Sequence, residues 1–251
     1  MSFNTPSCSA LERTFVALDN MSLEQVRILL NNNPEIVNIK IGLELFLSHG
    51  PQIVHILRTE FKLLQKIFLD LKLHDIPQTV KKAILALDKM PVDFLTIHLT
   101  GGREMLQAAL VAQQAALKNT KLLGVSFLTS LDQQNFLELW GIKTNDITPA
   151  FQRLFSLALD VAIQGLVLSP LELPQITALE KSIGKRMIKI TPGIRFREDQ
   201  QNHKTHDQKR IATFEEAFTA GADYVVIGRS LIESPDLKLR LKTLASYPIS
   251  T

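Results

Sequence analysis

The sequence predicts a single (β/α)8 barrel domain over residues 1–251. Eight short runs of β-branched or apolar residues, each closed by a polar or glycine-bearing turn, alternate with segments whose apolar residues follow helical spacing. The runs recur about every 30 residues, which is the size of one strand with its crossover helix. An open doubly wound sheet is the competing architecture, but the first turn, LDNMSLEQ, lacks the glycine-rich loop of a dinucleotide-binding fold.

The predicted elements follow one another without a linker or low-complexity tract. The strands are predicted at residues 14–18, 36–41, 66–71, 94–99, 122–127, 165–168, 187–191 and 224–228. Helices are predicted at 23–30, 80–87, 105–117, 151–163 and 214–220, among others. Ser22 with Gln25 has capping-box spacing. Thr148 and Ser169 are each predicted to be a helix cap residue before a proline suited to the first helical turn.

Composition excludes several classes of protein. The net charge of +3 is spread along the chain without a basic block, which argues against nucleic acid as the main partner. No apolar run approaches the roughly 18 residues needed to span a bilayer, and the first residues lack a secretory signal pattern. The single cysteine, Cys8, excludes an internal disulfide framework and a multi-cysteine metal site. We therefore expect a cytoplasmic protein that does not bind membranes.

Charged residues gather where four adjacent strands end. Because strand side chains alternate, Asp70 and Lys72 point to the barrel axis while the intervening leucines pack under the helices. The same alternation predicts that this end of the barrel also receives Asp19, Lys40 and His98, and that Thr96 points inside the barrel. An ion-pair layer that only closes the barrel is the alternative. Since desolvation offsets most of the attraction between buried charges, a run of alternating sign, with Asp75 one turn later, favours a functional site.

The loops after the last two strands have the features of a phosphate site. Strand seven ends in ITPGIR with Arg195, and strand eight ends in VVIGRS with Gly228 and Arg229. Barrel enzymes commonly bind a substrate phosphate with these two loops, and an arginine fork can grip two phosphate oxygens. Either arginine alone would more often be a surface residue. Residues 196–208 are polar and could close over the phosphate. Two histidines in this segment, at positions 203 and 206, have no neighbouring carboxylates at the spacing of metal ligands, so no metal is assigned.

Several motifs in order resemble the orotidine 5′-phosphate decarboxylase family. The segment DLKLHDIPQT, residues 70–79, resembles the family's DxKxxDIxxT motif. DxKxxD alone is shared with a wider suprafamily, but further matches span nearly the whole chain: FVALDN, IKIGLELF, LTS, TPGIR, DQKR and ADYVVIGRS. Two departures are a longer segment between TPGIR and DQKR and the lack of a cysteine often found in strand six.

The resemblance implies a stand-alone enzyme of pyrimidine biosynthesis that converts orotidine 5′-phosphate (OMP) to UMP and CO₂ without metal or cofactor. Lys72 would be the proton donor, within a charge array formed with Lys40, Asp70 and Asp75. Members of the family form homodimers, so the resemblance implies that Asp75 and Thr79 of one subunit complete the site of the other. The remaining substrate contacts implied by the resemblance are Asp19 and Lys40 at the ribose, Thr129 at the pyrimidine, and Arg195, Gln208, Gly228 and Arg229 at the phosphate. His98 lies outside the motif and is interpreted as a supporting residue.

Two alternatives remain open at this stage. A related barrel with the same DxKxxD core, such as a sugar-phosphate decarboxylase or hexulose-phosphate synthase, would use Mg²⁺ to stabilise an enediolate. A catalytically silent protein that binds a phosphate ligand is the other. Intact Asp70, Lys72 and Asp75 argue against the silent binder, because a binder has no use for a buried alternating array.

Overall fold

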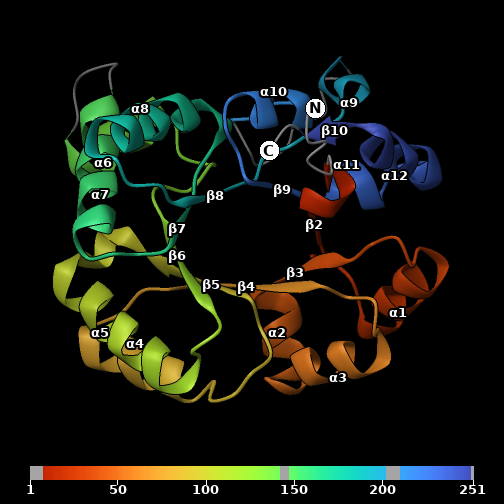
Figure 1. Cartoon of the computed structure of the whole chain (residues 1–251), viewed down its shortest axis with the longest axis horizontal. Coiled ribbons are helices and arrows are strands. Elements are labelled where there is room, and N and C mark those ends of the chain that lie inside the picture. The colour runs from red at the N-terminus through yellow and green to blue at the C-terminus, as the bar shows by residue number, and fades with distance from the viewer. Residues whose placement is uncertain (1–7, 142–146, 202–209, 250–251) are drawn as a thin grey trace, which may run out of the picture.

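The chain forms a closed barrel of eight parallel strands, β2 to β9 in sequence order, with helices packed around the outside (Figure 1). The computed structural model describes residues 8–141, 147–201 and 210–249. The barrel strands are β2 (Thr14–Ala17), β3 (Asn38–Gly42), β4 (Lys66–Leu73), β5 (Phe94–His98), β6 (Lys121–Val125), β7 (Gly165–Val167), β8 (Ile188–Thr191) and β9 (Tyr224–Ile227). The predicted fold class is confirmed, and β9 pairs with β2 to close the barrel.

The helices lie between the strands, as the sequence predicts, with shifted ends. They are α1 (Leu23–Asn32), α2 (Leu43–His49), α3 (Gln52–Glu60), α4 (Pro77–Leu85), α5 (Gly102–Ala116), α6 (Gln133–Trp140), α7 (Thr148–Asp160), α8 (Leu173–Ile183), α9 (Arg197–Gln201), α10 (Phe214–Thr219), α11 (Arg229–Ile232) and α12 (Leu237–Ser246), with 3-10 turns at Leu11–Arg13, Leu99–Gly101 and Pro170–Glu172. A short antiparallel pair, β1 (Cys8–Ser9) with β10 (Pro248–Ile249), joins the two ends of the described chain. Within these residues, no helix combines the length and hydropathy of a membrane span.

Helix caps partly follow the sequence prediction. The Ser22 hydroxyl accepts a hydrogen bond from the Gln25 N–H, and the Gln25 side chain returns the bond, so the predicted capping box is confirmed. Ser169 forms a similar box that opens a 3-10 turn. The prediction that Thr148 caps α7 is wrong, because Thr148 is itself helical and the cap position falls on Ile147. Proline is accepted at the first or second helical position, so it does not fix the cap to the residue just before it.

Two apolar layers separate the inside of the barrel from its outside. Outward-facing residues such as Val16, Ile39 and Leu69 pack under the helices. The interior layer contains Phe15, Ala17, Phe68, Phe94, Leu123, Val125, Val167, Ile190 and Val226. Phe15 contacts Phe68 and Phe94 edge to face, with ring centroids 5.6 and 5.7 Å apart. This aromatic floor fills the lower barrel, so polar groups on the same strand faces are left at the C-terminal mouth, where barrel enzymes place their chemistry.

Candidate active site

A cavity of about 420 Å³ opens at the C-terminal mouth of the barrel. Its walls come from strands that lie far apart in the sequence, including β2, β3, β4, β6, β7 and β9, and from the turn after β8. The predicted site residues that line it are Asp19, Lys40, Asp70, Lys72, Thr129, Arg195, Gly228 and Arg229. The fold therefore brings the predicted charged residues and the predicted phosphate residues to one cavity.

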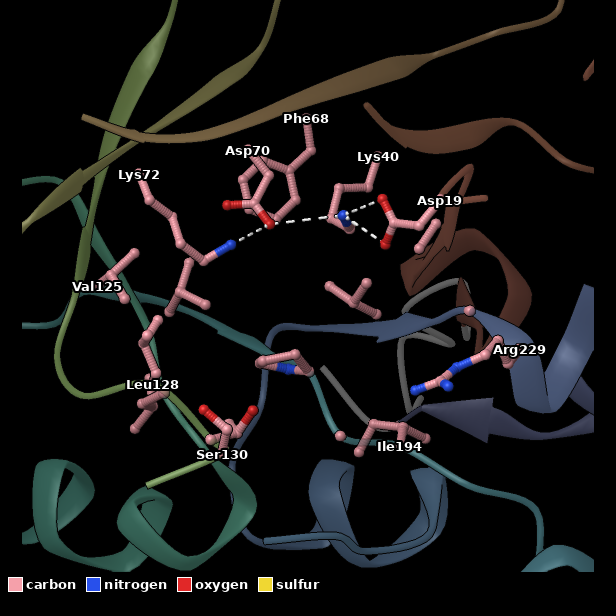
Figure 2. Close-up of a pocket in the computed structure, with 18 of the residues that line it drawn as sticks. Asp19, Lys40, Phe68, Asp70, Lys72, Val125, Leu128, Ser130, Ile194 and Arg229 are labelled. Carbon is pink, nitrogen blue, oxygen red and sulfur yellow. Dashed lines mark hydrogen bonds and ion pairs between the residues drawn. The ribbon is translucent and has the colours of Figure 1, made fainter. Parts of the chain in front are cut away.

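Four charges of alternating sign form a chain of ion pairs along one wall (Figure 2). The Lys40 ammonium donates to both oxygens of Asp19 at 3.0 Å and lies 3.5 Å from Asp70 Oδ2. Lys72 Nζ donates to the same Asp70 oxygen at 2.7 Å. We call Asp19, Lys40, Asp70 and Lys72 the ion-pair chain. Its central carboxylate is shared by two ammonium groups, which fixes the direction of the Lys72 amine.

Asp70 stays ionised although it is buried. Burial acts to raise the pKa of this carboxyl, but the Lys40 and Lys72 ammonium groups outweigh that effect and leave the pKa below its usual value. The Thr96 hydroxyl adds a hydrogen bond to Asp70 Oδ1 at 3.0 Å. The wall therefore presents a permanent negative charge directly beside the amine of Lys72.

The backbone at Lys72 is strained. Its φ of 50° lies in the left-handed region, and the pairing of β4 with β5 shifts register between Leu69 and Leu73. A residue other than glycine in this region costs about 1–3 kcal/mol and persists where its surroundings hold it. Here the Lys72 N–H donates to Thr96 Oγ1 at 2.8 Å. Thr96 thus holds both the backbone of Lys72 and the carboxylate that pairs with its amine.

Gly42 leaves space for the ion-pair chain. It ends β3, and a Cβ atom at this position would lie 2.4 Å from Asp19 Oδ1 and 3.3 Å from Lys40 Nζ. Any larger residue would displace the Asp19 carboxylate from Lys40. The sequence analysis missed this role, although the glycine directly after IKI in a predicted strand was an available signal.

The turn after β6 forms another part of the cavity wall. Thr129 and Ser130 line the cavity there, next to Leu128. The Leu128 carbonyl accepts a hydrogen bond from Arg210 Nη2 at 2.8 Å. Arg210 also pairs with Glu172, and both are buried. Sequence reasoning missed this support, because Arg210 and Leu128 are 82 residues apart and no local pattern connects them.

The predicted phosphate residues occupy the other end of the cavity. Arg195 follows β8 and is buried, and its backbone N–H donates to the Ala212 carbonyl at 2.9 Å. Arg229 opens α11 directly after β9, and Figure 2 shows its guanidinium directed into the cavity. A Cβ at Gly228 would meet only Ala17 Cβ, at an ordinary 3.5 Å. Among the described residues, the space at Gly228 therefore accommodates a methyl group in ordinary van der Waals contact.

Comparison with known proteins places this site in a family. A sequence profile described as "Orotidine 5'-phosphate decarboxylase / HUMPS family" matches residues 12–244. The chain belongs to this family. The protein named orotidine 5′-phosphate decarboxylase in Fusobacterium nucleatum is 38% identical over 233 residues, covering 92% of this chain and 94% of the relative. The protein of that name in Carboxydothermus hydrogenoformans is 39% identical over 234 residues, covering 91% and 92%.

Solved structures agree with that assignment. The crystal structure of orotidine 5′-phosphate decarboxylase from Lactobacillus acidophilus matches with a TM-score of 0.73 and 30% identity, covering 92% of this chain and 96% of that one. An uncharacterized conserved protein from Geobacillus kaustophilus matches with a TM-score of 0.72 and 29% identity, covering 93% and 100%. The likeness to the decarboxylase family thus extends over the whole barrel.

Some residues expected from the decarboxylase resemblance lie outside the cavity. Asp75 lies on the connection from β4 to α4 and Thr79 in the first turn of α4, and both are exposed. Asp75 Oδ1 accepts the N–H of Ile76 at 2.6 Å. Gln208 and the histidines at 203 and 206 lie outside the described residues, as does most of the predicted loop 196–208. In a single chain of this family, then, the cavity forms without the second aspartate of the motif.

His98 lies close enough to Lys72 and Asp70 of the ion-pair chain to interact with their charges. It ends β5 and packs against His74 with ring centroids 5.2 Å apart. Burial is the main cause that lowers its pKa to about 4, and the neighbouring His74 and Lys72 act in the same direction. The ring is therefore neutral at pH 7 and adds no positive charge near Lys72.

Proposed function

We propose that this protein decarboxylates orotidine 5′-phosphate to UMP and that Lys72 protonates C6 of the pyrimidine. Its relatives identify it as a carboxy-lyase of pyrimidine biosynthesis. The observation that carries the residue assignment is the placement of the Lys72 amine, 2.7 Å from an ionised, buried Asp70 at the cavity wall. The ion pair aims this amine into the cavity, and a general acid must be positioned in this way.

The reaction needs electrostatic stabilisation because of where the charge develops. The bond from C6 to the carboxylate breaks, CO₂ departs, and the electron pair stays on C6, where no adjacent carbonyl is placed to absorb it. The Lys72 ammonium stabilises this carbanion and then transfers an Nζ proton to C6. Charge that is already oriented in a site shielded from water is usually the largest contribution to catalysis. Asp70 keeps the ammonium in place during this step.

One end of the cavity binds the base and ribose of the substrate, and the other end binds its phosphate. The pyrimidine lies between Lys72 and the turn that carries Thr129, and the ribose hydroxyls meet Asp19 and Lys40. The phosphate binds at Arg195, Gly228 and Arg229, with Gln208 as a further expected contact. Phosphate binding far from C6 supplies energy that orients the base for reaction.

We further propose a homodimer in which Asp75 and Thr79 of each subunit complete the site of the other. Both side chains are exposed and lie outside the cavity of their own chain. Ile76 between them is 67% exposed. In such a dimer the second subunit would remove this apolar side chain from water.

We also propose a cytoplasmic location. The single cysteine, Cys8, is a free thiol, which suits a reducing compartment such as the cytoplasm.

A magnesium-dependent reaction on a sugar phosphate is the second candidate, because the family description includes relatives beyond the decarboxylase. Such chemistry needs carboxylates that are available to a metal ion. In this structure both Asp19 and Asp70 are engaged by lysine ammonium groups. That engagement favours the decarboxylase.

The test follows the ultraviolet absorbance of OMP mixed with purified protein in excess EDTA, with Lys72→Ala and Lys89→Ala measured in parallel. Lys89 is an exposed lysine far from the cavity and serves as the matched control. We expect metal-independent turnover in the wild type and in Lys89→Ala and none in folded Lys72→Ala. Absence of turnover by the folded wild type, followed by Mg²⁺-dependent turnover of a sugar phosphate, would replace this proposal with the second candidate.

A further inference from the structure

A partly buried polar cluster connects the segments that carry the two arginines at the phosphate end of the cavity, and its residues do not line the cavity. It consists of Asp199 at the α9 turn, Ser230 in α11 and Arg240 in α12. Of its three residues only Ser230 belongs to a motif named above, ADYVVIGRS. Ser230 directly follows Arg229 in the chain, and both Asp199 and Arg240 are hydrogen-bonded to Ser230. We call these three residues the Ser230 clamp.

Ser230 joins the two arginine-bearing loops directly. Its side chain is almost fully buried, at 5% exposure, and it follows Arg229 in the chain. Ser230 Oγ accepts the N–H of Phe196 at 3.1 Å, and Phe196 follows Arg195. The same hydroxyl donates to Asp199 Oδ2 at 2.5 Å. One side chain thus connects the residue after Arg195 to the residue after Arg229.

Arg240 and Asp199 hold that hydroxyl from behind. Arg240 donates to both oxygens of Asp199, at 2.8 and 2.7 Å, and also to the Ser230 carbonyl. Its guanidinium lies over the Phe196 ring, 4.7 Å from the centroid. A two-pronged arginine–carboxylate pair is geometrically specific as well as strong. The arrangement is more than needed to cover an apolar surface, since it fixes one hydroxyl and two backbone groups in a single position.

From this geometry we infer that Ser230, Asp199 and Arg240 are positioning residues that set the spacing of Arg195 and Arg229 for a phosphate monoester. The inference rests on the proposed phosphate site. A bidentate grip on phosphate tolerates little displacement, because misplacement of binding groups by about 1 Å can cost roughly a hundredfold in rate. The clamp therefore acts through the arginines and does not touch the reacting atoms.

The distinguishing experiment compares two substrates, OMP and the phosphate-free nucleoside orotidine. Ser230→Ala removes both hydroxyl bonds and leaves the backbone intact, and Asp199→Asn removes the carboxylate charge without a change of shape. We expect each variant to lower kcat/KM for OMP by about ten- to a hundredfold, because it loses one or two hydrogen bonds to charged or backbone groups. The value of kcat/KM for orotidine should stay unchanged within about twofold. Ser246→Ala, on the exposed part of the same α12 helix, is the control and leaves both values unchanged.

Arg229→Ala separates failure of the clamp from failure of the phosphate site. If Arg229→Ala loses activity toward OMP alone while folded Ser230→Ala and Asp199→Asn match the wild type, the clamp is refuted and the phosphate site stands. If Arg229→Ala leaves the ratio of the two kcat/KM values unchanged, the phosphate site itself is wrong. Equal losses toward OMP and orotidine in the clamp variants would show a merely structural role. Should Ser230→Ala fail to fold, Arg240→Lys keeps the charge, lacks the two-pronged pair, and gives the same comparison.

Discussion

Replacement of Thr96 by valine tests how the strained Lys72 is held in place. The hydroxyl of Thr96 donates to the buried, ionised Asp70 at 3.0 Å and accepts the Lys72 N–H at 2.8 Å. A hydrogen bond to a charged group contributes about 1.5–3 kcal/mol and a neutral one about 0.5–1.5 kcal/mol. The added buried methyl returns about 0.8 kcal/mol. We therefore expect Thr96→Val to lower the free energy of unfolding by about 1–4 kcal/mol.

The same change should also reduce catalysis, because Lys72 and Asp70 lose a common support. Urea unfolding followed by circular dichroism at pH 7 gives the stability, and the OMP assay gives kcat and KM. We expect kcat to fall more than tenfold with a smaller change in KM. Thr120→Val is the matched control, since Thr120 is equally buried and its hydroxyl makes one bond, to the Val92 carbonyl at 2.7 Å. With the same allowance for the buried methyl, it should cost less than about 1 kcal/mol and leave kcat unchanged. A Thr96→Val protein with wild-type kcat would refute the support of Lys72 by Thr96.

Three further changes test other parts of the site. Gly42→Ala should keep the fold and raise KM for OMP several-fold, because a Cβ at 2.4 Å displaces the Asp19 carboxylate from Lys40; steady-state kinetics with unchanged KM would contradict this. His98 has a folded pKa of about 4, below its unfolded value near 6.5, so the folded state binds fewer protons and stability is lost as pH falls from 6.5 towards 4. Urea unfolding at pH 7 and pH 5 should show a smaller difference in His98→Asn than in the wild type or in the exposed control His55→Asn, and an equal difference would disprove the assignment. Arg229→Ala should lower kcat/KM for OMP at least tenfold with an unchanged melting temperature, and wild-type kinetics would remove Arg229 from the phosphate site.

The sequence was sufficient for the barrel and for the direction of its side chains. Period-two alternation assigns Leu69 to the outer layer and Phe68 to the inner one, and the structure has both in those layers. Strand ends were less accurate. The run predicted at 66–71 extends to Leu73, because pairing with β5 resumes at Leu73 after the register shift. Hydrogen-bonded neighbours decide where a strand stops, and single-strand patterns do not contain them.

The supporting residues could not be predicted because their contacts are long-range. Thr96 was placed inside the barrel by alternation, but its two bonds to the Asp70–Lys72 segment depend on the irregular pairing of β4 with β5. The left-handed backbone of Lys72 likewise has no local signature, since lysine has no preference for positive φ. Arg240 lies 41 residues from Asp199, and only the folded chain brings them together.

Barrel closure explains how a substrate phosphate and the reacting carbon can be held by opposite ends of the sequence. β9, which leads to Arg229, pairs with β2, which leads to Asp19; β2 pairs with β3, and β3 with β4, which carries Lys72. Phosphate, ribose and base contacts would therefore follow one another around the rim in the order of these strands. Binding energy gained at Arg229 can then orient C6 at Lys72 only if the rim between them is rigid. We propose that the ion-pair chain at one end and the Ser230 clamp at the other contribute this rigidity. Variants of Thr96 and Ser230 should then affect OMP turnover by different routes, the first through kcat with either substrate and the second only when the phosphate is present.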